Sequence, residues 1–175
     1  MAIAEAAERG ARVIEGKNLR LVQFTEDHIT PRYLGWLNNR ELTQHMRHSN
    51  AVHTVQSALT YYDSIPRGDL FYAIEHHEHG HIGNIGASCD TLNSRADMSI
   101  FLGEHPGRGY ALEAWTLLMD ALLKQFHKAT AGTVVDNKAM IKLAWRSGMV
   151  EDGYRRRHDM RNGVMVDVVQ FARWA

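Results

Sequence analysis

A glycine-rich segment between a strand and a helix is the feature that most restricts the fold of this chain. Residues 96–102 alternate apolar and polar positions, which predicts a strand, and residues 111–126 carry an apolar stripe at helical spacing. Between them, Gly107 and Gly109 let the backbone approach a ligand closely. The first N–H groups of the helix are unpaired and point outward. The segment therefore predicts an anion site, well suited to a pyrophosphate, at the start of the helix.

Two well-known phosphate-binding motifs do not match this segment. A Walker loop needs Gly-x-x-x-x-Gly-Lys-[Ser/Thr], and no such string occurs in the chain. A dinucleotide fingerprint needs Gly-x-Gly-x-x-Gly in a first βαβ unit, whereas residues 107–112 read GRGYAL and follow several strands. A tight turn without a ligand is therefore the structural alternative. Arg108 favours the ligand, because a guanidinium can add a charge-assisted hydrogen bond to a phosphate.

The order of the other apolar patterns predicts one mixed sheet with helices on its faces. Thr25 is a suitable N-cap for the first helix, with His28 at the third helical position, and Asn162-Gly163 predicts a hairpin turn. The order β, helices, βββ, α, β, α, ββ predicts an α/β (α+β) fold whose central sheet is mostly antiparallel and has about seven strands. The strands are expected at residues 19–24, 70–74, 81–88, 96–102, 130–135, 149–154 and 164–172, and the helices after Thr25, around Leu42 and Met46, and at 54–65, 111–126 and 138–147.

The chain is expected to hold a single domain. Residues 1–17 read as a frayed or helical N-terminal extension, and residues 18–175 as the domain itself. No Pro-rich linker and no internal repeat divides the sequence. One domain of this size is ordinary for a globular protein.

Composition and charge exclude several classes of protein. The 20 Lys and Arg residues balance 20 Asp and Glu residues, which excludes a broadly basic nucleic-acid-binding protein. No run of 18 apolar residues occurs, and Glu5, Glu8 and Arg9 lie where a signal peptide needs an apolar stretch. The single cysteine, Cys89, allows no internal disulfide. We therefore expect a cytoplasmic protein without nucleic-acid or membrane partners.

Four stretches in order along the chain resemble one enzyme superfamily. Residues 107–111, followed by Glu113-Ala114, are similar to the loop that binds the pyrophosphate of acetyl-coenzyme A (acetyl-CoA) in the GNAT N-acetyltransferases. The resemblance is to the branch that contains ribosomal-protein alanine, polyamine and amino-sugar acetyltransferases. It implies direct transfer of an acetyl group from acetyl-CoA to an amine. Residues 19–21 and 33–41 resemble the opening strand and the first helix of the family. Residues 137–149 resemble its later N-x-x-A/S…K-x-G-F motif, and residues 151–155 resemble the x-E-G-x-x-R strand that follows.

The resemblance also implies which residues hold acetyl-CoA, and it implies no metal. The strand Ile100-Phe101-Leu102 would offer backbone groups to the pantetheine arm and an N–H to the thioester oxygen. Asn137 would bond the same arm, although a helix N-cap explains this residue equally. Lys142 and Arg146 share a helix face and would reach the phosphate end, the alternative being a solvated basic face. The pyrophosphate loop would consist of Gly107, Arg108, Gly109, Tyr110 and Ala111.

The resemblance does not supply a general acid. Many superfamily members carry a tyrosine where this chain has Ala144, and the ribosomal branch often has a serine where it has Met140. We expect Glu75 and Ser99 as the catalytic candidates. Glu75 ends a strand that flanks the substrate cleft of the family, with a polar hairpin end as the alternative reading. Ser99 shares its strand face with Asp97 and is expected to line the cleft.

The expected acceptor is a small primary amine, in particular an amino sugar or its nucleotide conjugate. Residues 36–39 read WLNN, which resembles the amino-sugar members of the branch, so Trp36, Asn38 and Tyr62 are the candidate substrate-binding residues. The alternative role of Trp36 is core packing, and that of Asn38 is to end the helix. Of Tyr61 and Tyr62, one is expected to face the core and the other to line the cleft. The alternative functions are acetylation of the N-terminal alanine of a ribosomal protein and a catalytically weak acyl-CoA-binding module. A homodimer stays open.

A histidine-rich segment invites a metal interpretation. Residues 76–81 read HHEHGH, and alternate histidines of a strand share one face. Imidazoles are common zinc ligands. The segment falls on an expected turn, however, so a solvent-exposed turn without a metal is the prediction.

Overall fold

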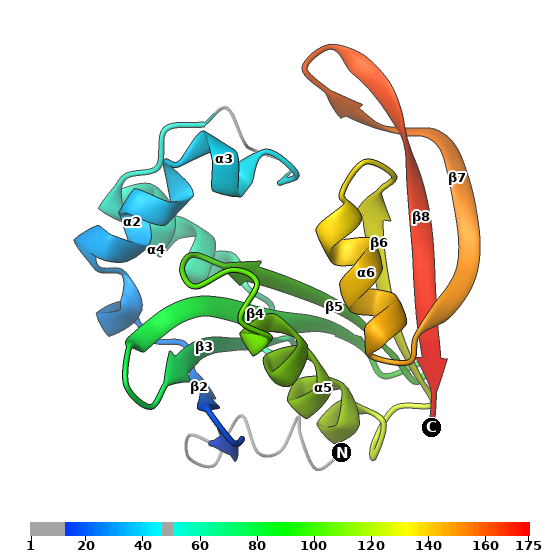
Figure 1. Cartoon of the computed structure of the whole chain (residues 1–175), viewed down its shortest axis with the longest axis horizontal. Helices are drawn as coiled ribbons and strands as arrows, with labels where there is room; N and C mark the ends of the chain where they lie inside the picture. Colours follow the sequence, from blue (N-terminus) through cyan, green and yellow to red (C-terminus); the bar gives the residue numbers. More distant parts are fainter. Residues whose placement is uncertain (1–12, 47–50) are drawn as a thin grey trace.

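One mixed sheet of eight strands runs through the molecule. The computed structural model describes residues 13–46 and 51–175. Neighbouring strands are antiparallel except for β5 and β6, which are parallel, and the order across the sheet is β1-β2-β3-β4-β5-β6-β8-β7 (Figure 1). The strands are β1 (Ile14–Glu15), β2 (Leu19–Gln23), β3 (Leu70–His76), β4 (Gly80–Asp90), β5 (Arg95–Leu102), β6 (Lys128–Val134), β7 (Val150–Arg161) and β8 (Val164–Trp174).

Helices cover both faces of the sheet, and each face has its own apolar core. One core lies under α5 and α6 and includes Trp115, Leu118 and Phe171. A second, smaller core lies under the N-terminal helices and joins Phe24 to the side chains of α2. The helical elements are the 3₁₀ turn η1 (Glu26–His28) and the α-helices α2 (Pro31–Leu37), α3 (Arg40–Thr43), α4 (Val55–Ser64), α5 (Tyr110–Leu122) and α6 (Lys138–Arg146).

The fold class predicted from the sequence is confirmed, and the N-terminal part adds detail. The extra strand is β1, which pairs with β2 inside the segment that we expected to be frayed or helical. Thr25 and His28 make the expected reciprocal capping contacts, but on a single 3₁₀ turn. Pro31 explains the break, because it disfavours helical geometry at Thr30, and Thr30 then caps α2 through Tyr33.

The last hairpin is longer than the sequence pattern indicates. We expected its first strand to end near Tyr154, but β7 continues to Arg161. The pairing with β8 shifts between Arg155 and Asp159, so a bulge bends the strand without ending it. Figure 1 shows the hairpin extending beyond the rest of the sheet. No helix among residues 13–46 and 51–175 is long and apolar enough to cross a membrane.

An opening in the sheet separates β5 from β6. The two parallel strands pair only from Arg95 to Asp97 and from Lys128 to Thr130. Both strands continue past these residues, to Leu102 and Val134, without a shared register, and they diverge in Figure 1. The β6-facing edge of residues 98–102 therefore keeps backbone groups that no described strand pairs with.

Candidate functional site

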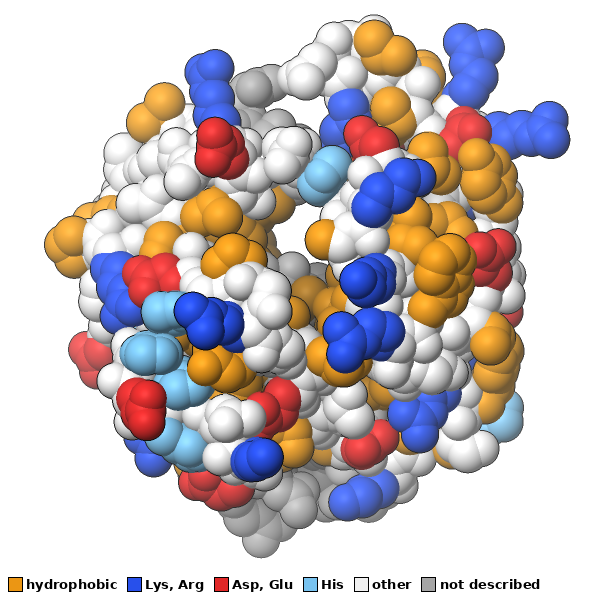
Figure 2. Space-filling view, viewed as in Figure 1, with side chains coloured by type: hydrophobic (Ala, Val, Ile, Leu, Met, Phe, Trp, Pro, Cys, Tyr) orange, Lys and Arg blue, Asp and Glu red, His pale blue; other side chains and the backbone are white. Residues whose placement is uncertain are grey.

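A cleft of about 1260 Å³ lies on the α2–α4 face of the sheet, beside this opening. Its floor is formed by β4, β5 and β6, one wall by residues of α2 to α4, and the other by the β7–β8 hairpin. Figure 2 shows a hollow at the centre of this view of the molecule. The volume is large enough for a cosubstrate arm and a small second substrate.

The floor of the cleft is polar where β4 and β5 meet. Asp97 and Ser99 alternate with buried residues of β5, and both line the cleft. Ser99 lies opposite Gly86, where a Cβ would lie 2.6 Å from the backbone oxygen of Leu70, so glycine allows the close approach of β3 to β4 at this point. Asn84, two residues before Gly86, has a buried Oδ1 without a hydrogen-bond partner among the described residues. These groups can contact a polar substrate from below.

Most charges in the cleft are neutralised by a neighbour, and one of each sign is not. Asp97 accepts a hydrogen bond from the Thr130 hydroxyl at 2.6 Å but makes no ion pair within the described chain. Arg155 contacts His158 at 3.2 Å and likewise has no carboxylate partner there. The ion pairs among the cleft residues are Arg95–Asp90 at 3.1 Å, Lys128–Asp152 at 2.5 Å and Arg161–Asp159 at 3.2 Å.

The glycine-rich segment has the geometry of an anion site. Gly107 and Gly109 have φ angles of +78° and +89°, which only glycine adopts without strain. Gly109 is the N-cap of α5, and a Cβ on either glycine would meet no atom within 4 Å. The first N–H groups of this 13-residue helix have no partner within the helix, and the two glycines before them leave open space for a ligand. The backbone is shaped to hold a phosphate or pyrophosphate.

The other predicted loop residues lie where a ligand could reach them. Arg108 is exposed between the two glycines, and Tyr110 and Ala111 form the first turn of α5, both half-buried. Ile100 and Phe101 line the cleft on the unpaired part of β5, whereas Leu102 packs into the α5–α6 core. The segment 100–111 thus runs without interruption from the cleft floor to the helix N-terminus.

The residues predicted on α6 split into a cap and a basic surface. Asn137 is the N-cap of α6: its Oδ1 accepts from the Met140 N–H at 3.2 Å, and its Nδ2 donates to Thr133 at 3.1 Å. The capping role is thus present, and a contact with a ligand stays a prediction. Lys142 and Arg146 are exposed, and Figure 2 shows Lys and Arg side chains over α6 beside the hollow.

The two catalytic candidates differ in position. Ser99 lines the cleft. Glu75 is on β3 and does not line it, because its carboxylate is held by Arg20 at 2.9 Å and lies 3.6 Å from His28. Of the two, only Ser99 can contact a molecule in the cleft without rearrangement. Asp97, which shares its strand face with Ser99, is the cleft carboxylate that forms no ion pair among the described residues.

The three predicted substrate-binding residues lie in supporting positions. Trp36 is buried in the smaller core, and a Cβ on Gly103 would lie 2.0 Å from its ring. Asn38 exchanges hydrogen bonds with the backbone of His53, a cleft residue. Tyr62 packs on Phe24, while Tyr61 lines the cleft, so the neighbouring tyrosine takes the expected place. These side chains shape the wall of the cleft from behind.

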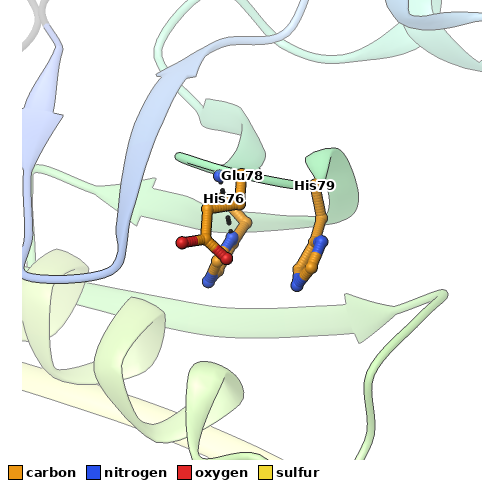
Figure 3. A group of neighbouring side chains, drawn as sticks. All are labelled: His76, Glu78 and His79. Atoms are coloured by element: carbon orange, nitrogen blue, oxygen red, sulfur yellow. Dashed lines mark hydrogen bonds between the residues drawn. The ribbon is translucent and has the colours of Figure 1, made fainter.

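The exposed turn expected in the histidine-rich segment is present at residues 77–80, but His76 at its start is buried. His76 is 7% exposed, and its Nδ1 accepts a hydrogen bond from the Glu78 N–H at 3.1 Å (Figure 3). A neutral imidazole with one accepting nitrogen carries its proton on the other. His76 therefore has no spare lone pair while this bond stands, although donor atoms of His76, Glu78 and His79 lie within 4.8 Å of one another.

Burial lowers the pKa of two histidines of this region, His76 and His81. Burial, followed by the charge of His79, lowers the pKa of His76, which stacks on the His79 ring at 4.4 Å. His81 lies outside the turn, against Tyr33 and Trp36, and burial lowers its pKa to about 4. Buried His76 and half-buried His81 thus lie on either side of the exposed residues 77–80 at this end of the β3–β4 hairpin.

Sequence reasoning missed the part of the site that the hairpin supplies. Arg155, Arg161 and the ion pair of Lys128 with Asp152 line the cleft. The pattern indicated a strand that ends at Tyr154, so the charged run after it had no assigned position. A continuous run of charged residues before an Asn-Gly turn was the available signal.

Comparisons with known proteins agree with this geometry. Residues 18–150 match the family model described as an acetyltransferase (GNAT) domain. Comparison with curated protein sequences gives no significant match. The fold is similar to a ribosomal L7/L12 alpha-N-protein acetyltransferase, RimL, in complex with coenzyme A, with a TM-score of 0.79, 20% identity and coverage of 93% of this chain and 98% of that chain.

Two further solved structures share the fold at similar distance. The microcin C7 self-immunity acetyltransferase MccE, in complex with acetyl-CoA and AMP, has a TM-score of 0.81 and 18% identity, over 91% of this chain and 94% of that one. Spermidine N-acetyltransferase from Vibrio cholerae, in complex with CoA and spermine, has a TM-score of 0.79 and 18% identity, over 91% and 96% of the two chains.

Proposed function

The chain belongs to the acetyltransferase (GNAT) family, and from this premise we propose that it transfers an acetyl group from acetyl-CoA directly to the primary amine of a small molecule, an amino sugar or sugar nucleotide. One observation carries the proposal. The opening between β5 and β6 lies between the N-terminus of α5, which begins after Gly109, and the cleft. The cleft contains Asp97, a carboxylate that forms no ion pair among the described residues. A nucleotide-like cosubstrate and an amine can therefore meet at β5.

The glycine loop and α6 are the proposed binding surface for the phosphates of acetyl-CoA. The N–H groups after Gly107 and Gly109 would receive the pyrophosphate, with Arg108 beside it. Lys142 and Arg146 add positive charge on the far side of the opening. The backbone edge of Ile100 and Phe101 is free to bond an extended amide chain. These groups fit acetyl-CoA in sign and in order.

Asp97 and Ser99 are the proposed contacts of the acceptor amine. Acetyl-CoA, when bound, supplies an acetyl thioester. Asp97 has no competing cation among the described residues, so its carboxylate can hold the ammonium group and accept its proton as the N–C bond forms. Ser99, two residues along on the same face, can relay this proton from Asp97 to the thiolate that the broken C–S bond leaves, so that no charge remains on the serine. Glu75, bound to Arg20, is not required in this scheme.

The local charge of the cleft supports a small acceptor over a basic protein tail or a polyamine. Basic substrates favour a cleft with excess carboxylate. Among the described residues, the cleft instead has four aspartates and four Lys and Arg residues, and three of each form ion pairs with one another. Acceptors with little net positive charge are therefore preferred. No feature of the cleft specifically favours the N-terminus of a ribosomal protein.

A thiol-release assay across acceptor classes tests the proposal. We expect CoA release with amino sugars, and a fall in kcat/KM of about 100-fold in Asp97→Asn because the proton acceptor is lost. Asp63→Asn, on the exposed side of α4, is the matched control and should change kcat/KM by less than about 2-fold. CoA release only with spermine or with a peptide that starts with alanine would show that the acceptor is a polyamine or a protein N-terminus and not an amino sugar. No CoA release with any amine would show that the protein binds acyl-CoA without catalysing transfer.

A further inference from the structure

Among the described residues, one cation of the cleft, Arg155, has no acidic partner. The β7–β8 hairpin carries consecutive arginines at 155, 156 and 157, all exposed, but only Arg155 lines the cleft. Within residues 13–46 and 51–175, each of the other Lys and Arg side chains that line it forms an ion pair with an aspartate. Arg155 contacts only the ring nitrogen of His158 among the described residues, and that contact leaves its positive charge uncompensated.

Arg155 is held at a defined place on the hairpin wall. It pairs with Val168 of β8, immediately before the bulge that runs to Asp159. Val168 in turn pairs with Val134, the last residue of β6. The guanidinium therefore lies on the hairpin side of the opening between β5 and β6, and not beside the glycine loop where the cosubstrate phosphates are placed.

The sheet register separates Arg155 from the proposed amine position. Asp97 pairs with Thr130, and Arg155 is level with Val134, four residues further along β6. Four residues along a strand and three strand spacings across put the two Cα atoms on the order of 20 Å apart. The long Arg155 side chain covers part of that span. A ligand that touches both carries its amine and its anion at well-separated ends.

We propose that Arg155 forms an anionic subsite, and that the acceptor is an amine whose other end carries a phosphate or diphosphate, as in a nucleotide-linked amino sugar. The inference rests on the proposed function, since it is the amine held at Asp97 that sets the acceptor's direction. A guanidinium binds phosphate oxygens through two parallel hydrogen bonds. A polyamine would instead bring a second cation to Arg155 and be repelled.

The test compares two acceptors with the same reacting amine. UDP-glucosamine carries the diphosphate, and methyl glucosaminide has a neutral group in its place. We expect kcat/KM for UDP-glucosamine to exceed that for methyl glucosaminide at least 10-fold in the wild-type protein. Arg155→Gln should reduce that ratio about 10-fold, because a charge-assisted bond is lost, and should leave the neutral acceptor within 2-fold. Arg156→Gln, the neighbouring arginine outside the cleft, should keep the wild-type ratio.

Calorimetric binding of UDP-glucosamine to the CoA-loaded protein separates this inference from the proposed function. Binding that Arg155→Gln weakens about 10-fold supports the subsite, even where turnover is absent and the proposed function fails. Equal kcat/KM for both acceptors in the wild type would overturn the subsite while leaving acetyl transfer in place. It is also overturned by equal losses in Arg155→Gln and Arg156→Gln, or by binding that neither change affects.

Discussion

At the scale of single residues, the backbone conformation of the glycine-rich segment agrees with the prediction made from its sequence. The spacing of Gly107 and Gly109 predicted an anion site, and both residues adopt left-handed φ with open space around them. The same sequence spacing does not reveal that Glu113 has a structural task. Its carboxylate accepts hydrogen bonds from the backbone and the side chain of Asn18, at 2.8 and 2.7 Å. The family-like Glu113 therefore ties α5 to the start of β2.

The charge of a side chain at position 109 should control acetyl-CoA binding. Gly109→Asp and Gly109→Asn have the same size and both tolerate left-handed φ, so they carry similar backbone strain. The aspartate alone repels the pyrophosphate. We expect its Kd for acetyl-CoA, measured by calorimetry, to exceed that of the asparagine variant about 10-fold. Equal Kd values in the two variants would show that the pyrophosphate of acetyl-CoA does not bind at this loop.

Glu113 should make the stability of the protein depend on acidic pH. Burial raises the pKa of Glu113, but the hydrogen bonds from Asn18 and from the backbone of Lys17 and Leu19 together outweigh it and hold the pKa below its ordinary value of 4.5. A lowered pKa stabilises the fold above pH 4.5, and that stabilisation is lost as the pH falls through the folded-state pKa. Glu113→Gln should therefore cost about 1–3 kcal/mol at pH 7 in urea unfolding and less below pH 4. A constant cost from pH 7 to pH 3 would contradict this assignment.

At the scale of elements, the sequence patterns were reliable where a core defines the period. The strand β5 and the helix α5 bury one face, so their alternation and helical stripe predicted them within a few residues, and β3 is buried on both faces, as its continuous apolar run indicated. The strand β7 is exposed along almost its whole length and carries no such period. Its extension to Arg161 depends on pairing with β8, a contact that the local sequence does not encode. For this reason the hairpin wall of the cleft could not be predicted.

The basic face of α6 should contribute to acetyl-CoA binding through long-range attraction. Lys142→Gln combined with Arg146→Gln is expected to raise the KM for acetyl-CoA about 3- to 10-fold at low salt. The effect should shrink at 0.5 M salt, because screening weakens exposed charges. Lys124→Gln, an exposed lysine after α5, is the charge-matched control and should leave KM unchanged. An effect that persists at high salt would indicate a direct contact.

At the scale of the whole molecule, the cleft is closed by elements far apart in the sequence. Arg161, near the tip of the β7–β8 hairpin, donates a hydrogen bond to the backbone oxygen of Met46 at 2.6 Å, after α3. It also pairs with Asp159, and its side chain is only 17% exposed. Although the net charge of the chain is zero, charged side chains gather in the cleft, and the contacts of Arg161 join its two walls. Asp97 and Arg155 remain for a ligand.

Loss of the contact between the hairpin and α3 should affect the acceptor and spare the cosubstrate. Arg161→Met keeps an apolar stem of similar length but cannot bond Met46, so the wall that carries Arg155 should become less ordered. We expect the KM for the acceptor to rise about 10-fold, while the KM for acetyl-CoA stays within 2-fold because the glycine loop lies elsewhere. Arg156→Met is the control on the same strand. Equal rises in both KM values would instead mean that the hairpin supports the fold as a whole, and unchanged values would show that the contact does not shape the cleft.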